Sequence, residues 1–146
     1  MIGSYVPRPE WLMLDWHHAC LEADMVTIQR CASCATWRHP PRRFCAACRS
    51  RESAFVPVSG AGTVRSYAVS HRSMDPGWHE ATPYATLVVA LDEQVSLLAA
   101  TTSTPNDLAL GMPVQCSIER RSDDFVLVWA EPSDETPDIR PAASGR

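Results

Sequence analysis

Two Cys-x-x-Cys pairs constrain the fold of this chain more than any other feature. The first pair is Cys31 and Cys34, the second is Cys45 and Cys48, and ten residues separate them. Each pair can turn two sulfurs toward one point, so two facing pairs offer four thiolates to a tetrahedral zinc ion. Two disulfides or unliganded cysteines are the alternative. A zinc ion with four protein ligands has no open coordination position, so it would hold structure together and would not activate water.

The charge around the cysteines agrees with a metal site. Four thiolates around Zn²⁺ leave a net charge of about −2, and nearby arginines would offset it and favour the thiolate form. Glu52 is the only acidic neighbour. His39 lies between the pairs and, with all four cysteines present, is predicted to be a surface residue. The arginines of this segment are Arg30, Arg38, Arg42, Arg43, Arg49 and Arg51.

Charge is distributed unevenly along the chain. All thirteen basic residues are arginine, which excludes Schiff-base lysines and phosphate-loop lysines. Residues 1–72 carry nine arginines against five acids, and residues 73–146 carry four against twelve. A formal net charge of −4 therefore combines a basic front half with an acidic back half. The basic half suits the phosphates of a nucleic acid or of a phosphorylated cofactor.

Length and composition predict a soluble globular protein. The 146 residues are 45% hydrophobic and 21% charged, enough for one modest core and a small metal-stapled module. No apolar run is long enough to span a bilayer, and the N-terminus lacks the pattern of a secretion signal. We therefore expect a cytoplasmic protein, since that compartment keeps thiols reduced and available for zinc.

The front part of the chain predicts a helix and a β-ribbon. Trp11, Leu14, His18 and Leu21 recur at helical spacing, which predicts one apolar face on a helix over residues 10–23. That helix either packs on its own domain or inserts Trp11 and Trp16 into a partner. Short strands over residues 25–30 and 54–58 flank the cysteines, a pattern that favours a zinc ribbon.

The rest of the chain predicts a barrel. Its strands are expected at residues 63–71, 84–91, 95–101, 113–120 and 125–130, with one helical turn within residues 105–111. Val64, Tyr67 and Val69 are the predicted packing positions of the first strand, and residues 72–83 form a long loop of the functional kind. The fold class is thus mainly β, and five strands match a Greek-key barrel of the OB type. The predicted division is residues 1–24 helical, 25–59 zinc ribbon, 60–132 OB barrel and 133–146 disordered tail.

An ordered set of motifs resembles a known family. It runs from the two cysteine pairs with Pro40-Pro41 between them, through Gly62-Thr63-Val64, Tyr67 and Pro83-Tyr84, to a Leu110-Gly-Met-Pro-Val114 segment. The set is similar to the zinc-ribbon plus OB-fold proteins associated with acyl-CoA enzymes, and the resemblance covers about residues 11–132. The chain departs from that pattern at Ala35 and Arg49, where such ribbons often carry glycine, a residue that tolerates positive φ.

The resemblance implies an accessory subunit and not an enzyme. Members of the family form hetero-oligomers with thiolase-like enzymes, aldolases or MaoC-type enoyl-CoA hydratases, and their barrel helps to complete the acyl-CoA site. Coenzyme A would then be shared with the partner, and arginine forks and aromatic rings suit its phosphates and adenine. The residues predicted to contact the cofactor or the partner are Arg65, Arg72, Trp78 and Tyr84.

Single-stranded nucleic-acid binding is the competing hypothesis. Zinc ribbons and OB barrels both occur in proteins that hold single strands by stacking and positive charge. Here the predicted barrel carries most of the acids while the arginines cluster in the ribbon, which favours a protein partner. No catalytic residue is predicted, because the sequence contains no recognisable nucleophile motif, dinucleotide glycine pattern or second metal-ligand cluster.

Overall fold

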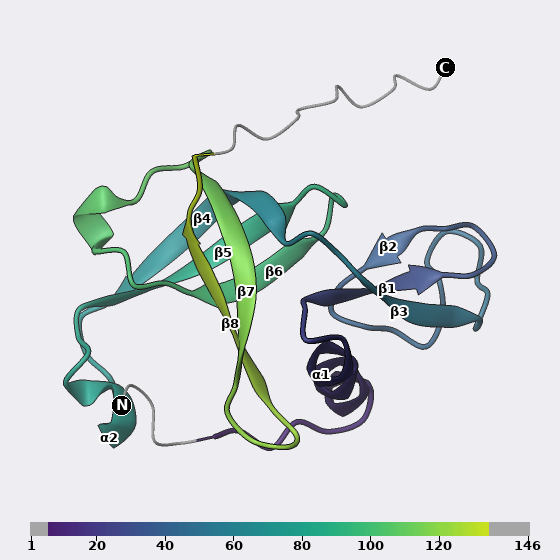
Figure 1. The fold of residues 1–146 in the computed structure, drawn as a ribbon, viewed down its shortest axis with the longest axis horizontal. Coiled ribbons are helices and arrows are strands. Elements are labelled where there is room, and N and C mark those ends of the chain that lie inside the picture. The colour runs from purple at the N-terminus through teal and green to yellow at the C-terminus, as the bar shows by residue number, and fades with distance from the viewer. Residues whose placement is uncertain (1–5, 135–146) are drawn as a thin grey trace.

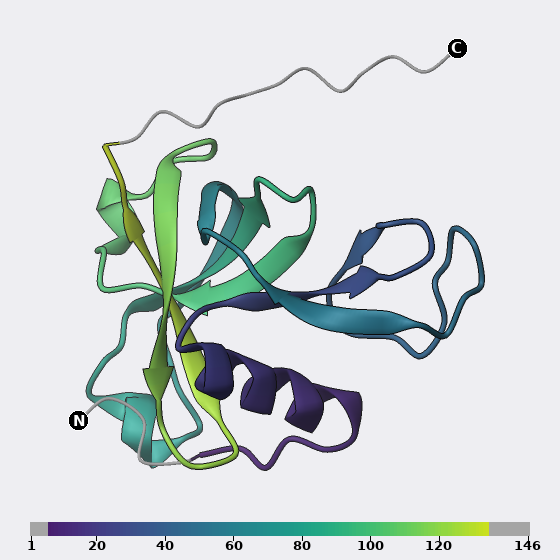
Figure 2. The ribbon, with the colours of Figure 1, turned by 45° about the vertical axis from the view of Figure 1, so that its right-hand side comes forward.

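The computed structural model describes residues 6–134, so the tail predicted to be disordered lies, from residue 135 on, outside the described residues. A small ribbon sheet and a closed barrel lie side by side, and the N-terminal helix packs beneath their junction (Figure 1). The 45° turn of Figure 2 shows the helix in contact range of both modules. No helix within residues 6–134 has the length and apolar character needed to cross a membrane.

The N-terminal helix α1 spans Leu12–Ala23, and its buried face differs from the predicted one. Trp16, His17 and Cys20 are buried, whereas Trp11 at the N-cap is 75% exposed. The helix is therefore rotated relative to the predicted face, because the core that covers it is supplied by two modules whose positions the local spacing does not encode. Asp24 ends the helix in the left-handed conformation, and its N–H donates to the carbonyl oxygen of Cys20.

The ribbon confirms the predicted zinc-ribbon architecture. Its strands are β1 (Thr27–Cys31), β2 (Trp37–Arg38) and β3 (Ser53–Pro57). They form an antiparallel sheet in the order β2-β1-β3, with Arg30 opposite Trp37 and Ile28 opposite Val56. The strand order brings both cysteine pairs to the end of the ribbon away from the barrel, as the ribbon drawing shows (Figure 1).

The predicted five-stranded barrel is also confirmed. Its strands are β4 (Ala61–Ser70), β5 (Tyr84–Leu91), β6 (Ser96–Ala100), β7 (Pro113–Arg120) and β8 (Val126–Pro132). They close in the order β4-β5-β6-β8-β7, with β4 pairing β7 and with β6 and β8 parallel. Alternate residues of β5 are buried throughout the strand, as expected when one face lines the barrel interior. The predicted helical turn is a 3₁₀ turn, η1, at Pro105–Asp107, and the long loop carries an unpredicted helical turn, α2, at Pro76–His79.

A bulge in β4 changes which residues face the core. Val64 pairs with Val89 but Ser66 pairs with Val88, so Arg65 is the extra residue. Val64 is buried as predicted, whereas Tyr67 is 37% exposed, its hydroxyl directed at the carbonyl oxygen of Leu108. The bulge places Tyr67 opposite the buried Leu87, on the inward side of the sheet, but the ring is only partly covered there, so Tyr67 is less buried than predicted.

One continuous core joins the helix, the ribbon and the barrel. It contains Trp16 and Cys20 of α1, Ile28 of β1, and inward-facing barrel residues such as Leu87 and Val128. Cys20 and Cys116, which stand outside the two cysteine pairs, are both buried within it. Burial of these side chains between modules is worth roughly 1.5–3 kcal/mol for each large one, so the two modules and α1 hold a fixed arrangement.

Candidate metal centre and ligand-facing surface

The two cysteine pairs form two matching turns. In the first, the N–H of Ala35 donates to the carbonyl oxygen of Cys31 at 3.0 Å, and in the second the N–H of Arg49 donates to that of Cys45 at 2.8 Å. Ala35 has a φ of 60° and Arg49 a φ of 63°, so both occupy the left-handed region. The chain thus carries alanine and arginine at the two positions of the cysteine turns where the backbone conformation favours glycine.

The geometry of the four sulfurs fits a structural zinc ion. All four Sγ atoms lie within 4.8 Å of one another, with Cys31 and Cys48 sulfurs 3.6 Å apart and Cys34 and Cys45 sulfurs 3.5 Å apart. A tetrahedral ion with Zn–S bonds of about 2.3 Å requires sulfurs about 3.8 Å apart. A bound zinc would stabilise the two turns against each other, with all four positions filled by protein.

The pKa values of the cysteines show why a cation is needed. Backbone N–H groups of Cys48 and Ala47 hold the pKa of Cys45 at about 6, despite partial desolvation. The N–H of Ser50 lowers the pKa of Cys48, but the sulfur of Cys34 and desolvation raise it, and the result is about 12. Four adjacent sulfurs cannot all be thiolates unless a positive charge compensates them, which is the role of Zn²⁺ in this donor set.

The arginines of the ribbon stack on aromatic rings. The guanidinium of Arg30 lies 4.9 Å from the ring centre of Trp37, and that of Arg51 lies 4.8 Å from Phe44. The guanidinium of Arg43 lies 5.7 Å from the ring centre of Trp11, so the ribbon contacts the residue that precedes α1. These pairs keep positive charge near the metal centre and leave Trp11 and Phe44 mostly exposed.

His39 corrects a prediction. It was expected at the surface of the ribbon, but its ring centre lies 4.9 Å from that of Trp16, and its Nδ1 is buried with no hydrogen-bond partner among the described residues. Burial, followed by the charges of His17 and Arg42, lowers its pKa to about 4. The turn that holds the cysteines folds its Pro-rich tip back against α1, and a single sequence does not reveal that direction.

Adjacent residues of α1 bind the two modules. The indole Nε1 of Trp16 donates to the carbonyl oxygen of Thr27 in the ribbon at 2.7 Å. The backbone N–H of Val126 in the barrel donates to Nδ1 of His17 at 3.2 Å. Burial and then the neighbouring His18 lower the pKa of His17 to about 4, so the ring is neutral and its Nδ1 is free to accept. The helix thus fixes the ribbon relative to the barrel.

The four residues predicted to contact a cofactor are only partly brought together. The ring centres of Trp78 and Tyr84 lie 4.9 Å apart, one in α2 and one at the start of β5, and Arg72 is exposed in the same loop. Arg65 is separate: it sits at the bulge of β4, and its Nη1 donates to Oγ of Ser96 on β6. Cofactor contact by any of the four remains a prediction.

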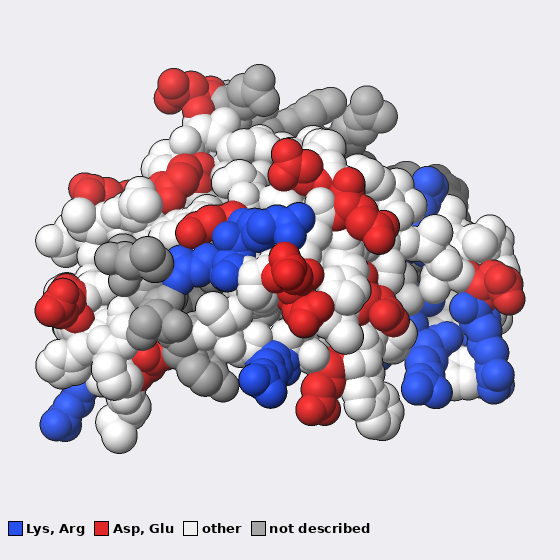
Figure 3. Space-filling model, turned by 60° about the horizontal axis from the view of Figure 1, so that its bottom comes forward, with Lys and Arg blue, Asp and Glu red and all other residues white. Residues whose placement is uncertain are grey.

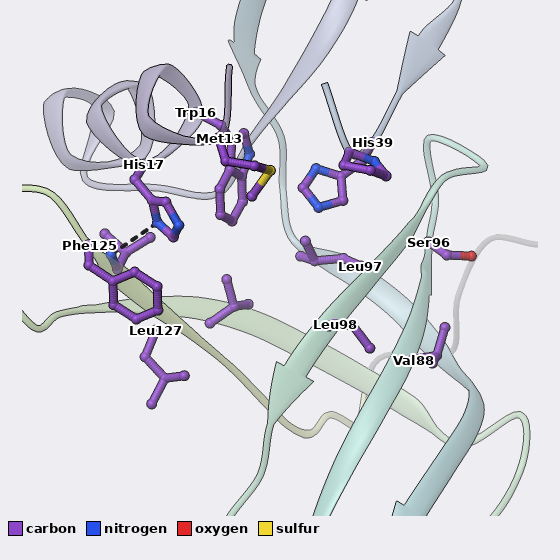
Figure 4. A pocket seen from close by; sticks show the side chains of 13 residues that line it. Met13, Trp16, His17, His39, Val88, Ser96, Leu97, Leu98, Phe125 and Leu127 are labelled. Atoms are coloured by element: carbon purple, nitrogen blue, oxygen red, sulfur yellow. Dashed lines mark hydrogen bonds between the residues drawn. The ribbon is translucent and has the colours of Figure 1, made fainter. Parts of the chain in front are cut away.

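A pocket of about 400 Å³ lies between α1, the ribbon tip and the barrel, and sequence reasoning missed it. Its walls are formed by Met13, Trp16 and His17 of α1, by His39 and Pro40, and by barrel residues of β5, β6 and β8. Figure 4 shows the imidazole of His39 directed into this space, between Met13 and Leu97. The only sequence signal was weak: Leu98, Phe125 and Leu127 are apolar at positions that face away from the barrel interior.

The fold and the four-cysteine cluster define a two-module class of protein, a zinc ribbon joined to an OB-type barrel. Family models place this chain within that class: residues 26–54 match the rubredoxin-like zinc ribbon domain of ChsH2, and residues 55–119 match its C-terminal OB-fold domain. The chain belongs to the ChsH2/DUF35 family.

Named relatives fall into two groups. A "Probable enoyl-CoA hydratase alpha subunit" of Thermomonospora curvata is 35% identical over 87% of this chain, which spans 36% of that protein. The 3-oxo-4,17-pregnadiene-20-carboxyl-CoA hydratase alpha subunit of Mycobacterium tuberculosis is 32% identical, and the match covers 75% of this chain and 34% of that one. A DUF35 domain-containing scaffold protein of Methanocaldococcus jannaschii is 26% identical over 83% of this chain and 86% of its own length.

Solved structures agree with the fold. A chain of the Ltp2–ChsH2(DUF35) aldolase matches with a TM-score of 0.76 and 30% identity, over 87% of this chain and 98% of that one. A DUF35-family protein from Sulfolobus solfataricus matches with a TM-score of 0.53 and 16% identity, over 82% of this chain and 84% of that one. The second likeness concerns the fold alone.

Proposed function

We propose that this chain is a non-catalytic accessory subunit that binds an acyl-CoA-metabolising enzyme and contributes to its acyl-CoA site. The observation that carries the proposal is the match over nearly the whole ChsH2 chain of an aldolase structure, at 30% identity and a TM-score of 0.76. The names of the hydratase alpha subunits and of the scaffold relative support it. The partner is an aldolase, a thiolase-like enzyme or an enoyl-CoA hydratase.

The chemistry of the described residues favours a non-catalytic role. Within residues 6–134, the one histidine–carboxylate pair is His18 with Asp124, at 2.7 Å on the surface, and the adjacent Ser122 hydroxyl accepts a hydrogen bond from the N–H of Asp124. The buried His17 has its Nδ1 engaged by a backbone N–H. A site for acyl transfer or hydration needs a nucleophile or base that is held by a third group next to a substrate position, and the catalytic groups are therefore assigned to the partner.

The ribbon end is the proposed docking surface. It presents Trp11 at 75% and Phe44 at 51% exposure, each stacked with an arginine. Exposed aromatic and arginine side chains are the residue types enriched at the centres of protein interfaces. Figure 3 shows arginines at the ribbon end of the face seen there, with acidic and basic side chains intermixed over the rest. A zinc-stapled ribbon offers this surface in a fixed shape, at little cost in ordering on binding.

The loop between β4 and β5 is the proposed point of contact with coenzyme A. The Trp78–Tyr84 pair offers an aromatic surface, and Arg72 in the same loop offers a guanidinium for a phosphate. This loop and the β7–β8 loop are the ones that border the ligand face of OB barrels in general. Arg65 lies at the opposite side of that face, beside Ser96.

Reconstitution tests the proposal. Aldolases, thiolase-like enzymes and enoyl-CoA hydratases from the same host are purified with and without this chain, and kcat/KM for each thioester substrate is measured at a saturating amount of the chain. We expect a stable complex and at least a tenfold higher kcat/KM with the chain present. Phe44→Ala together with Arg43→Glu should weaken the complex, whereas Leu110→Ala, at a residue of similar exposure on the barrel, should not. If the chain formed no complex with any of these enzymes and did not change their kcat/KM, the proposal would be refuted.

A further inference from the structure

The outer face of the barrel is unusually apolar where it meets the helix and the ribbon. Val88 on β5 and Leu98 on β6 are paired across the two strands and both line the 400 Å³ pocket, as do Phe125 and Leu127 on the β8 side. Outward-facing barrel positions are normally polar, because water covers them. Here Leu98 remains 65% exposed, so this apolar surface is only partly covered by the chain itself.

The walls of the pocket carry no charge. Among the described residues that line it, the polar side chains are His17, His39 and Ser96, together with the indole of Trp16. The pKa of each histidine is lowered to about 4, with desolvation by burial as the largest cause, so both rings are neutral at pH 7. Ser96 accepts a hydrogen bond from Arg65, and Trp16 donates to the ribbon backbone. A charged ligand would therefore lose its hydration in this pocket without a compensating partner.

A second hollow lies beside the pocket, on the side of the loop proposed to contact coenzyme A. This hollow of about 200 Å³ shares Phe125 and Leu127 with the first and, unlike it, is also lined by charged residues, Asp75 and Arg121, next to Trp78. The first hollow is thus apolar, and the one beside it offers polar and charged groups near α2. A volume of about 400 Å³ lies within the range of small-molecule sites, about 300–1,000 Å³.

We propose that this pocket binds the uncharged aliphatic part of an acyl thioester, with the thioester end directed toward Trp78. The ligand class follows from the uncharged walls of the pocket, from the polar and charged groups of the neighbouring hollow, and from the position of the pocket on β5 and β6, the ligand face of OB barrels. The inference rests on the proposed function for the source of the ligand, but the binding itself belongs to this chain alone. The binding site would lie where α1, the ribbon tip and the barrel meet, because each of them supplies one wall of the pocket.

Binding of N-acetylcysteamine thioesters to the isolated full chain tests the inference. These probes carry the acyl chain and an uncharged head, and their affinity is measured by calorimetry for a series from acetyl to decanoyl. We expect affinity to rise about fourfold for each added methylene until the pocket is filled, as for burial of a CH₂ group in an apolar site. Free coenzyme A should not displace the decanoyl probe, because its charges have no partner in this pocket.

Two leucines of nearly equal exposure supply the matched variants. Leu98→Glu places a carboxylate on the apolar wall and should weaken decanoyl binding at least tenfold, while Leu110→Glu, at a residue 69% exposed and outside the pocket, should leave it unchanged. Leu98→Trp fills the pocket mouth without a charge and should also weaken binding. In spectra of ¹³C-methyl methionine, the signal of Met13 should shift on binding and that of the exposed Met74 should not.

The outcomes separate the inference from the proposed function. No dependence on chain length, equal affinity of the two glutamate variants, or displacement by free coenzyme A would each overturn the inference. Loss of enzyme assembly in Leu98→Glu, with no thioester bound by the native chain, would also overturn it and assign the pocket to a side chain of the partner. Binding of the thioester by a chain that does not affect the partner enzyme would leave the pocket in place and refute the accessory role.

Discussion

Ala35 and Arg49 make the zinc ribbon weaker than it could be, and Ala35→Gly tests this directly. Ala35 has a φ of 60° in the first cysteine turn. A Cβ in the left-handed region costs about 1–2 kcal/mol, and glycine loses about 0.5–1 kcal/mol of conformational entropy on folding relative to alanine. The net effect of Ala35→Gly should be a gain of about 0.5–1 kcal/mol.

That gain should appear as tighter zinc binding, because the turn forms only when the metal and the fold form together. A gain of about 0.5–1 kcal/mol corresponds to a roughly twofold to fivefold lower dissociation constant for zinc. The measurement is competition against a chromogenic zinc chelator at a fixed pH. The pH must be held constant, since the cysteines release protons when they bind the metal.

Ala32→Gly provides the control with the opposite expected sign. Ala32 lies in the same turn and is also exposed, and its φ is not positive. Its N–H donates to the carbonyl oxygen of Glu52, a bond that glycine keeps. Only the entropic cost of glycine remains, so zinc binding should weaken by a similar factor. If both variants changed the dissociation constant in the same direction, backbone strain at residue 35 would not explain the effect.

Four further predictions concern the metal site, two histidines and two glycines. Cys45→Ser should abolish stoichiometric zinc binding and unfold the ribbon, with loss of partner assembly but retained barrel signals by NMR; full zinc content would contradict this. His17 and His39 have pKa values of about 4 in the folded chain against 6.5 for the free side chain, so the unfolded chain binds their protons first as pH falls. Stability should be complete above pH 6.5 and fall between pH 6.5 and 4, by at most about 1.4 kcal/mol per pH unit for each histidine, and His39→Phe should make that slope in urea titrations shallower. Gly62→Ala should cost more than about 2 kcal/mol, because its Cβ would collide with a backbone carbonyl oxygen of β5. Gly111→Ala meets no atom within 4 Å and should cost only the strain of its positive φ, as thermal unfolding can show.

The sequence predicted the local features well because they depend on local chemistry. The cysteine spacing, the alternation in residues 84–91 and the turn signals between strands each act over a few residues. β5 (Tyr84–Leu91) and β7 (Pro113–Arg120) accordingly have the predicted bounds. The positive φ at Ala35 and Arg49 fits the family resemblance, in which glycine is common at these two positions.

The features that sequence reasoning missed depend on how modules pack. The direction of the ribbon tip brings His39 against Trp16, and the bulge at Arg65 shifts which residues of β4 face inward. Neither has a pattern of its own in one sequence, because each is set by contacts between segments far apart along the chain. The apolar pocket is the largest example, since its walls come from residues 13–17, 39–40, 88, 96–98 and 125–128.

The surface of the barrel argues against the single-strand hypothesis on physical grounds. OB barrels that hold oligonucleotides use the face of their second and third strands, with basic side chains for phosphates and aromatic rings for bases. Here those strands are β5 and β6, and the pocket on them presents Val88 and Leu98, with no charged side chain among its described lining residues. Three arginines of the ribbon, Arg30, Arg43 and Arg51, stack on the protein's own aromatic rings, and Arg65 of the barrel donates to Ser96. A strand on this barrel would therefore place phosphates against an apolar wall and lose hydration without compensation. We expect labelled single-stranded DNA not to bind in a saturable, salt-dependent way. If it did bind in this way and Leu98→Glu weakened the binding, the result would contradict both this argument and the assignment of the pocket to an acyl chain.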